Sequence, residues 1–203
     1  MKTSLKRLQQ YLFDLEGAYY VGKDGHSRYG QSVHGCGYSR LEKAKQQASL
    51  KPVPVEKVND LVVAFLKEIG IHSMPLKIDS SDIAAIDYEK IAIEYGLKKE
   101  ADIIWIKLAS NGAVGVVCAS DDVNLQMPSC PEDYDAKSPN GDWLYNTAGI
   151  ILHKLGMTWQ PFVIIFPLPG IPKGYRRGDI EQAVGNMLIE AEVPIIDYYS
   201  HCY

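Results

Sequence analysis

Apolar residues recur along this chain with two spacings, and the clearest pattern lies in Pro161–His201. It opens with a continuous apolar run, Phe162–Phe166, which is typical of a strand buried on both faces. A loop rich in proline and glycine follows, then apolar residues at helical spacing, then a second apolar run, Val193–Tyr199. Strand, loop, helix and strand in this order predict the crossover unit of a parallel sheet.

A basic loop precedes the helix of this unit. Asp179 fits the N-cap position of the helix, and Gln182 follows three residues later, as in a capping box. Lys173, Arg176 and Arg177 stand directly before it, where aligned peptide dipoles already place about half a positive charge. Three cations at such a helix end repel one another unless an anion lies among them. That anion is either Asp179 or a phosphate or carboxylate ligand, and the sequence leaves both alternatives open.

The N-terminal third of the chain is predicted to be mostly helical. Apolar stripes indicate one helix from Thr3 or Ser4 to about residue 16 and another over 55–69, which Gly70 ends. A polar helical stretch covers residues 40–50, and a segment rich in glycine and tyrosine covers 17–38. We therefore divide the chain into a helical N-terminal region, residues 1–72, and an α/β domain, residues 73–203.

The α/β domain is predicted to contain a mixed sheet of about four to five strands. Ile103–Ala109 and Ala113–Ala119 flank Asn111-Gly112, a dipeptide that favours a two-residue hairpin turn. A short strand is expected over 76–78, and helices over 80–95 and 142–155. The fold class is therefore α/β, or mixed α+β, ending in a parallel βαβ unit.

Composition excludes some classes of protein. The net charge of −4 argues against a generally basic nucleic-acid binder. The four cysteines are dispersed, with no CxxC pair, which predicts neither a zinc knuckle nor a disulfide framework. We recognise no signal peptide, and the uncharged stretch 155–172 contains four prolines, so we expect a cytoplasmic protein without a membrane helix.

The predicted strand ends gather candidate chemistry. If the second hairpin strand runs parallel to the two strands of the crossover unit, all three end at one edge of the sheet. That edge would hold Asp121 and Asp122, the basic loop, and Asp197 with His201. The two aspartates could bind Mg²⁺ while the arginines hold phosphate oxygens and His201 acts as acid or base. The alternative is that the aspartates are turn residues and that His201 lies in a frayed tail.

The glycine- and tyrosine-rich segment offers a second candidate site. Its tyrosines could stack a nucleotide base, with Arg28 supplying charge. His26, His34 and Cys36 are zinc-type ligands, but no fourth ligand stands at a usual spacing. A loop with surface histidines is the simpler interpretation.

Two functions are consistent with these patterns. The first is binding of a phosphorylated small molecule or nucleotide at the basic loop, as in a metal-assisted hydrolase that processes a phosphoester. The alternative is a non-catalytic interaction subunit that docks a protein partner through the glycine- and tyrosine-rich segment. The sequence does not decide whether the protein is an enzyme.

Overall fold

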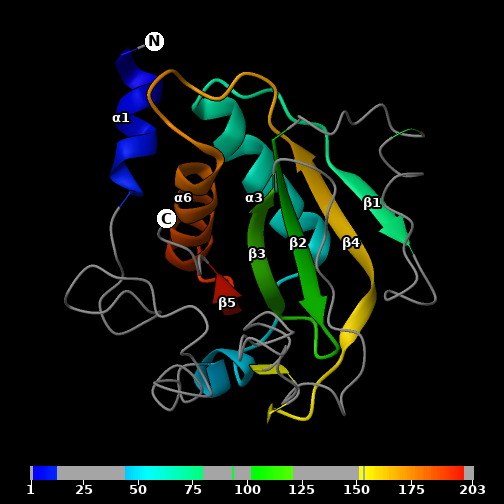
Figure 1. The fold of residues 1–203 in the computed structure, drawn as a ribbon. Coiled ribbons are helices and arrows are strands. Elements are labelled where there is room, and N and C mark those ends of the chain that lie inside the picture. The colour runs from blue at the N-terminus through cyan, green and yellow to red at the C-terminus, as the bar shows by residue number, and fades with distance from the viewer. Residues whose placement is uncertain are drawn as a thin grey trace, which may run out of the picture.

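The computed structural model describes residues 2–12, 44–79, 93, 102–120, 151–152 and 154–198. These residues form a five-stranded mixed sheet with helices, which confirms the predicted α/β class (Figure 1). The helices and strands are, in chain order, α1 (Lys2–Gln10), α3 (Val55–Glu68), β1 (Leu76–Asp79), β2 (Ile103–Ala109), β3 (Val114–Ser120), β4 (Trp159–Pro167), α6 (Arg177–Glu190) and β5 (Ile195–Tyr198). The order of strands in the sheet is β1-β4-β2-β3-β5.

Three strands of the sheet run in the same direction. β2 is antiparallel to both of its neighbours, β3 and β4, so these two point the same way, and β5 is parallel to β3. β5 therefore pairs with β3 rather than with β4, and α6 carries the chain past two intervening strands. The crossover unit expected from the sequence exists, but its two strands are not neighbours.

The predicted hairpin forms with a loop of three residues instead of two. The N–H of Ala109 donates to the carbonyl of Ala113 at 2.9 Å, and the N–H of Gly112 donates to the carbonyl of Ala109 at 2.8 Å. Gly112 has φ +90°, which a residue with a side chain rarely adopts. A type I turn followed by a left-handed glycine is the common geometry of three-residue hairpin loops. Asn111 closes the turn, because its side-chain oxygen accepts the N–H of Ala113 at 3.0 Å.

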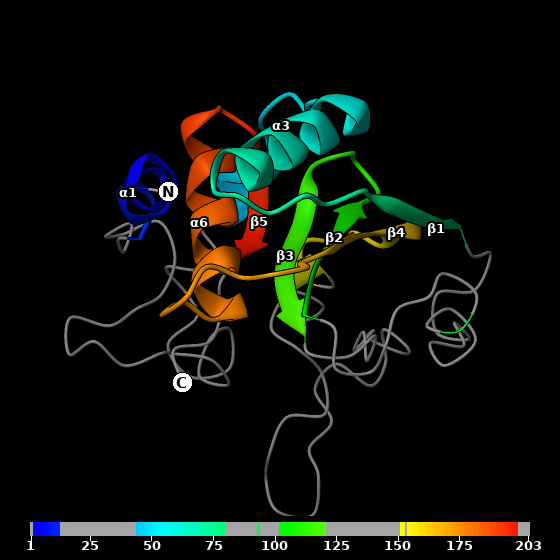
Figure 2. The same cartoon turned by 90° about the horizontal axis from the view of Figure 1, so that it is seen from above.

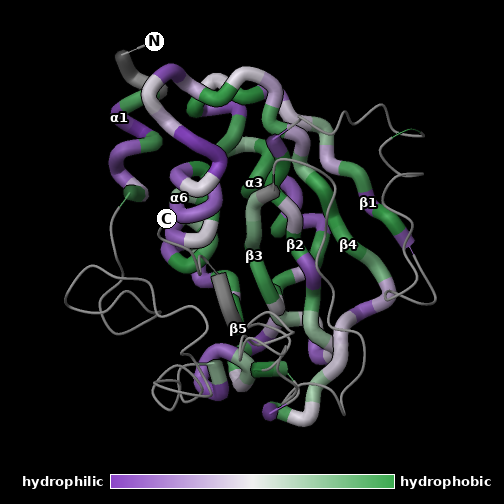
Figure 3. Tube along the Cα trace, in the orientation of Figure 1, coloured by the Kyte–Doolittle hydropathy of each residue, from purple (hydrophilic) through white to green (hydrophobic). Residues whose placement is uncertain are grey.

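The main hydrophobic core lies between the sheet and the helices (Figure 2). Alternate residues of β2 (Ile104, Ile106 and Leu108) face α3 and α6 in one cluster of buried side chains. The strands are coloured mostly at the hydrophobic, green end of the scale, whereas the helices alternate between green and purple (Figure 3). Leu8 of α1 and Phe65 of α3 belong to this cluster, so described parts on both sides of residue 72 share a core. The division into two domains stays a prediction.

α6 begins two residues before the predicted N-cap. Arg176 is the N-cap, with extended backbone angles, and Arg177 is the first helical residue. Asp179 is thus the third residue of the helix, and its carboxylate accepts the N–H of Arg176 at 2.7 Å. The prediction that Asp179 is the N-cap, with Gln182 completing a capping box, was wrong. Asp179 itself has the acidic role that the capping box assigns to its third helical position.

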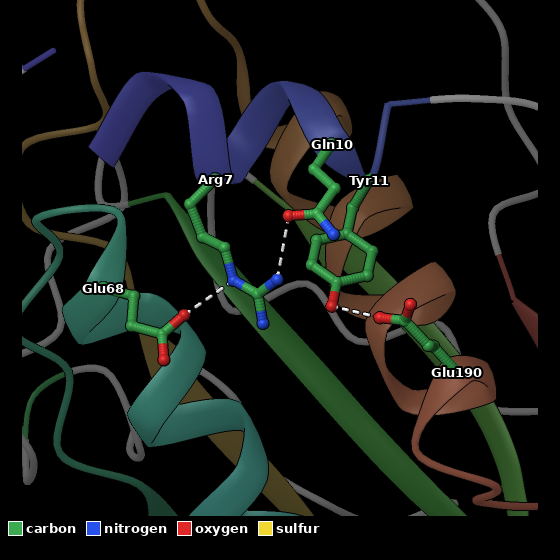
Figure 4. Close-up of polar contacts among 5 residues, drawn as sticks. All are labelled: Arg7, Gln10, Tyr11, Glu68 and Glu190. Carbon is green, nitrogen blue, oxygen red and sulfur yellow. Dashed lines mark hydrogen bonds and ion pairs between the residues drawn. The ribbon is translucent and has the colours of Figure 1, made fainter. Parts of the chain in front are cut away.

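Polar contacts attach α1 to the two helices over the sheet (Figure 4). Arg7 Nε donates to Glu68 Oε2 of α3 at 2.8 Å. The hydroxyl of Tyr11, just beyond α1, donates to the carboxylate of Glu190 in α6. Asn186 of α6, a buried residue, donates from Nδ2 to the backbone carbonyl of Tyr11 at 2.6 Å.

The ring of Tyr11 also packs into the core. It meets Phe65 edge-on, with 5.4 Å between the two ring centroids. The Arg7 guanidinium lies over the Tyr11 ring, 4.7 Å from the ring centroid. Burial, and next the hydrogen bond to Glu190, raise the pKa of the Tyr11 hydroxyl. The helix starts at Lys2, before the predicted caps Thr3 and Ser4, which are therefore inside it.

Candidate functional site

The carboxyl ends of β3 and β4 lie at one edge of the sheet, and β5 runs in the same direction but ends opposite Val117 of β3. At this edge Ile103, the first residue of β2, pairs with Ser120 at the end of β3 and with Pro167 at the end of β4. The chain leaves β4 beside the same residues, since the N–H of Leu168 donates to the carbonyl of Asp102 at 2.8 Å. The strand directions assumed from the sequence for β3, β4 and β5 are therefore correct.

One of the three predicted cations is paired at this edge. Arg177 Nη1 lies 3.2 Å from Asp102 Oδ1, and both side chains are partly exposed. Asp102 directly precedes β2, so the pair connects the first residue of α6 to the edge where β3 and β4 end. Asp102 was not among the predicted site residues. The sequence does place this aspartate directly before the apolar strand β2, at the end opposite the hairpin, and such a position indicates a charged group at the sheet edge.

The other two cations are exposed on the loop before α6. Lys173 lies in a turn next to Gly174, whose φ is +91°, and Arg176 caps the helix. Among the described residues, neither side chain forms an ion pair. The carboxylate of Asp179 is turned to the backbone of Arg176 instead of to a cationic side chain. Lys173 and Arg176 are thus the cations of this loop best placed to meet an anion from solvent.

Of the remaining predicted site residues, Asp197 lies within β5, where it pairs with Val116 of β3, and the others lie outside the described part of the chain. These are Arg28, Asp121, Asp122 and His201, together with His26, His34 and Cys36. Within the described ranges no group of three or more His, Cys, Asp or Glu side chains could hold a metal ion. Those ranges also contain no helix with the length and apolarity that a membrane crossing requires. The Mg²⁺ site at Asp121 and Asp122 stays a prediction.

A second cluster of unusual chemistry lies in the middle of the sheet. Lys107, in β2, is fully buried, with its Nζ 4.7 Å from the ring centroid of Trp105 and 5.0 Å from that of Trp159. Burial lowers the pKa of Lys107 to about 7, although the charge of nearby Cys118 acts in the opposite direction. Within the described residues, the indole N–H groups of Trp105 and Trp159 are buried and have no acceptor.

Trp159 reaches this cluster because β3 contains a glycine. A Cβ built on Gly115 would lie 2.4 Å from Cζ3 of Trp159, so the indole covers the backbone at this position. Glycine in a strand often marks such a close approach. Lys107 was not among the predicted site residues, although the sequence places this lysine in the centre of an otherwise apolar strand.

Comparisons with protein families, curated proteins and solved structures give no match for this chain. The function must therefore be inferred from the chemistry of its own residues.

Proposed function

We propose that this protein binds a phosphorylated small molecule or nucleotide through the loop that precedes α6. The observation that carries the proposal is the position of this loop, which begins at the sheet edge where β3 and β4, two strands that run in the same direction, both end. In open α/β sheets, the crevice beyond the carboxyl ends of the strands is the usual place for ligands.

The charges of the loop support an anionic ligand. Lys173 and Arg176 are exposed, and Arg176 stands at the positive end of a helix of 14 residues. Arg177, which directly follows Arg176 in the sequence, pairs with Asp102 at 3.2 Å. Guanidinium groups bind phosphate oxygens with two parallel hydrogen bonds, and lysine binds them as a point charge.

Catalysis is a further part of the proposal. Asp121 and Asp122 follow directly after β3 in the sequence, and β3 ends opposite Ile103, the neighbour of Asp102. Carboxylates that follow a strand end are suited to Mg²⁺, which binds one or two of them together with substrate phosphates. In that case the protein would be a hydrolase of phosphoesters, with His201 as acid or base.

A thermal-shift experiment on the full chain tests the binding proposal. The probes are inorganic phosphate and ATP, each with and without Mg²⁺. A ligand at a hundredfold its dissociation constant should stabilise the wild type by about 2.7 kcal/mol. The double variant Lys173→Ala/Arg176→Ala should lose this response, since both cations are exposed and their removal leaves the ion pair of Arg177 intact.

A matched control removes the same charge elsewhere. Lys57 and Lys67 are exposed on α3, and the double variant Lys57→Ala/Lys67→Ala should respond as the wild type does. An equal response in the Lys173/Arg176 variant would reject the loop as the site. If no probe stabilises any form of the protein, the alternative of a non-catalytic interaction subunit is favoured.

A further inference from the structure

Lys107 and Cys118 are neighbours on the sheet face turned away from α3 and α6. In the register of β2 and β3, Trp105 pairs with Cys118, and Lys107 pairs with Val116. Paired residues of an antiparallel sheet point to the same side, so Lys107 and Cys118 form a diagonal pair. Such neighbours are about 7–8 Å apart at their Cα atoms, within reach of a long side chain. Cys118 also packs against the cluster that contains Trp105 and Val116.

The two groups differ in their access to solvent. Cys118 is present as a thiol and is partly exposed, whereas Lys107 is fully buried. A reagent from solvent therefore meets the sulfur first. With a pKa of about 7, Lys107 is neutral in a large fraction of molecules at physiological pH. A neutral amine can accept the proton of a thiol, whose ordinary pKa is about 8.5.

The same cluster contains hydrogen-bond donors that lack an acceptor in the described structure. The indole N–H of Trp105, a residue with only 4% exposure, is one, and the indole N–H of Trp159 is the other. A buried donor without an acceptor destabilises the folded protein. Trp105 is the direct cross-strand partner of Cys118, so an oxygen atom attached to a group on that sulfur would be near its indole.

We propose that Cys118 accepts a small acyl group from an activated ester or thioester, with Lys107 as general base and the Trp105 indole N–H as donor to the acyl oxygen. The thiol proton moves to Nζ of Lys107 as the sulfur attacks the carbonyl carbon. The negative charge that develops on the carbonyl oxygen is stabilised by the indole N–H. The intermediate then collapses, the bond to the leaving group breaks, and the leaving group takes the proton. The product is a thioester on Cys118.

The described neighbours of Cys118 favour an apolar acyl group. The described side chains of this cluster are Ile78, Ile103, Trp105, Val116, Val163 and Ile165, all buried. They carry no carboxylate or second amine that would bind a charged chain. An acetyl group is therefore the appropriate probe.

The test is the reaction of the full chain with p-nitrophenyl acetate at pH 7, followed by peptide mass spectrometry. We expect a hydroxylamine-labile acetyl group on Cys118, formed at least about tenfold faster than in the urea-unfolded chain. Lys107→Met should slow this reaction about tenfold or more at pH 7 but little at pH 9.5, where the thiol ionises without a base. Lys77→Met, in the exposed side chain on β1, should react as the wild type does.

Trp105→Phe distinguishes the role of the indole N–H from the general reactivity of the Cys118 thiol, because phenylalanine keeps a ring but lacks the N–H. We expect at least about tenfold slower acetylation, since removing one donor to a developing oxyanion typically costs that much or more. Alkylation of Cys118 by iodoacetamide, which develops no oxyanion, should be unchanged. Equal slowing of both reactions would show a merely structural role for Trp105.

The wild type alone also provides a test, should Lys107→Met fail to fold. The acetylation rate of Cys118 should level off above pH 7, instead of rising until the ordinary thiol pKa of about 8.5 is passed. A rate that follows the ordinary thiol titration, or that equals the rate of the unfolded chain, would overturn the proposal.

Discussion

At the scale of single residues, the buried lysine of β2 determines the electrostatics of the sheet interior. Lys107 is fully enclosed, and transferring its charge from water is costly. The rings of Trp105 and Trp159 offset part of this cost, because a charged ammonium group is attracted to the face of an aromatic ring. Burial is the main influence on this group and lowers its pKa to about 7.

This balance predicts how stability depends on pH. Between pH 7 and 10.5 the unfolded chain holds a proton on Lys107 that the folded chain has released. The free energy of unfolding of the wild type should therefore rise across this interval, by up to about 1.4 kcal/mol per pH unit from this group. Below pH 7 both states are protonated, and the contribution is constant.

Urea unfolding of the wild type and of Lys107→Met, at half-unit steps from pH 6 to 10, measures this dependence. The variant should be the more stable protein at pH 6, and its advantage should shrink as the pH rises. Lys77→Met serves as the control, since its side chain is half exposed. A difference between wild type and Lys107→Met that does not vary with pH would contradict the prediction.

A second prediction at this scale concerns the glycine under Trp159. Gly115→Ala places a methyl group 2.4 Å from the indole, so the ring or the strand must move, at a cost of about 1–3 kcal/mol. Gly178→Ala, in the first turn of α6, has no atom within 4 Å of the added Cβ and should be neutral or slightly stabilising. Thermal unfolding of both variants makes the comparison, and equal stabilities would show that the close approach is unimportant.

At the scale of elements, the start of α6 shows how local chemistry positions a helix. Gly174 reverses the chain, Arg176 is extended, and the carboxylate of Asp179 returns to accept its N–H. An acidic group in the first turn is also favoured by the helix dipole. Proline and glycine between residues 167 and 174 locate this boundary well in the sequence. They do not show whether Asp179 is the N-cap itself or the third residue of the helix.

Asp179→Ala should therefore destabilise the protein by about 1 kcal/mol, through loss of one charge-assisted hydrogen bond and one favourable dipole contact. Asp179→Glu should retain most of the stability, because glutamate is the usual third residue of a capping box. Urea denaturation compares the two variants. A larger loss in Asp179→Glu than in Asp179→Ala would mean that the shorter side chain has a different role.

The other elements were predictable where the pattern is local. The β2–β3 hairpin, the buried run of β4 and the end of α3 at Gly70 all follow from neighbouring residues. The insertion of β4 between β1 and β2, and the ion pair of Arg177 with Asp102, involve residues far apart in sequence. Hydrophobic spacing assigns a residue to a face of an element, but it does not choose the neighbouring strand or the distant partner of a charge.

At the scale of the whole molecule, the N-terminal helix joins the structure through contacts that span almost the whole chain. Leu8 supplies a buried apolar contact, and Tyr11 adds its ring and its hydroxyl. Arg7 and Glu68 are more exposed, and exposed pairs contribute only about 0–1 kcal/mol. The attachment of α1 should therefore depend more on Tyr11 than on Arg7.

Tyr11→Phe tests this ranking. The variant keeps the ring but loses the hydrogen bond to Glu190, and a hydrogen bond to a charged group contributes about 1.5–3 kcal/mol. Arg7→Met should cost less, about 1 kcal/mol at most. Unfolding in urea, with proteolysis of the N-terminal residues as a second measurement, compares them. A greater loss in Arg7→Met would instead assign the attachment to the arginine.

The distance in sequence between Tyr11 and Glu190, its hydrogen-bond partner, also affects when α1 can pack during synthesis. The two residues are 179 positions apart, and synthesis at 5–20 residues per second places roughly 10 to 40 s between them. Throughout this interval Leu8 and Tyr11 have none of the α6 surface against which they pack. These apolar side chains therefore stay exposed during synthesis, and α1 can pack in its final place only after α6 has left the ribosome.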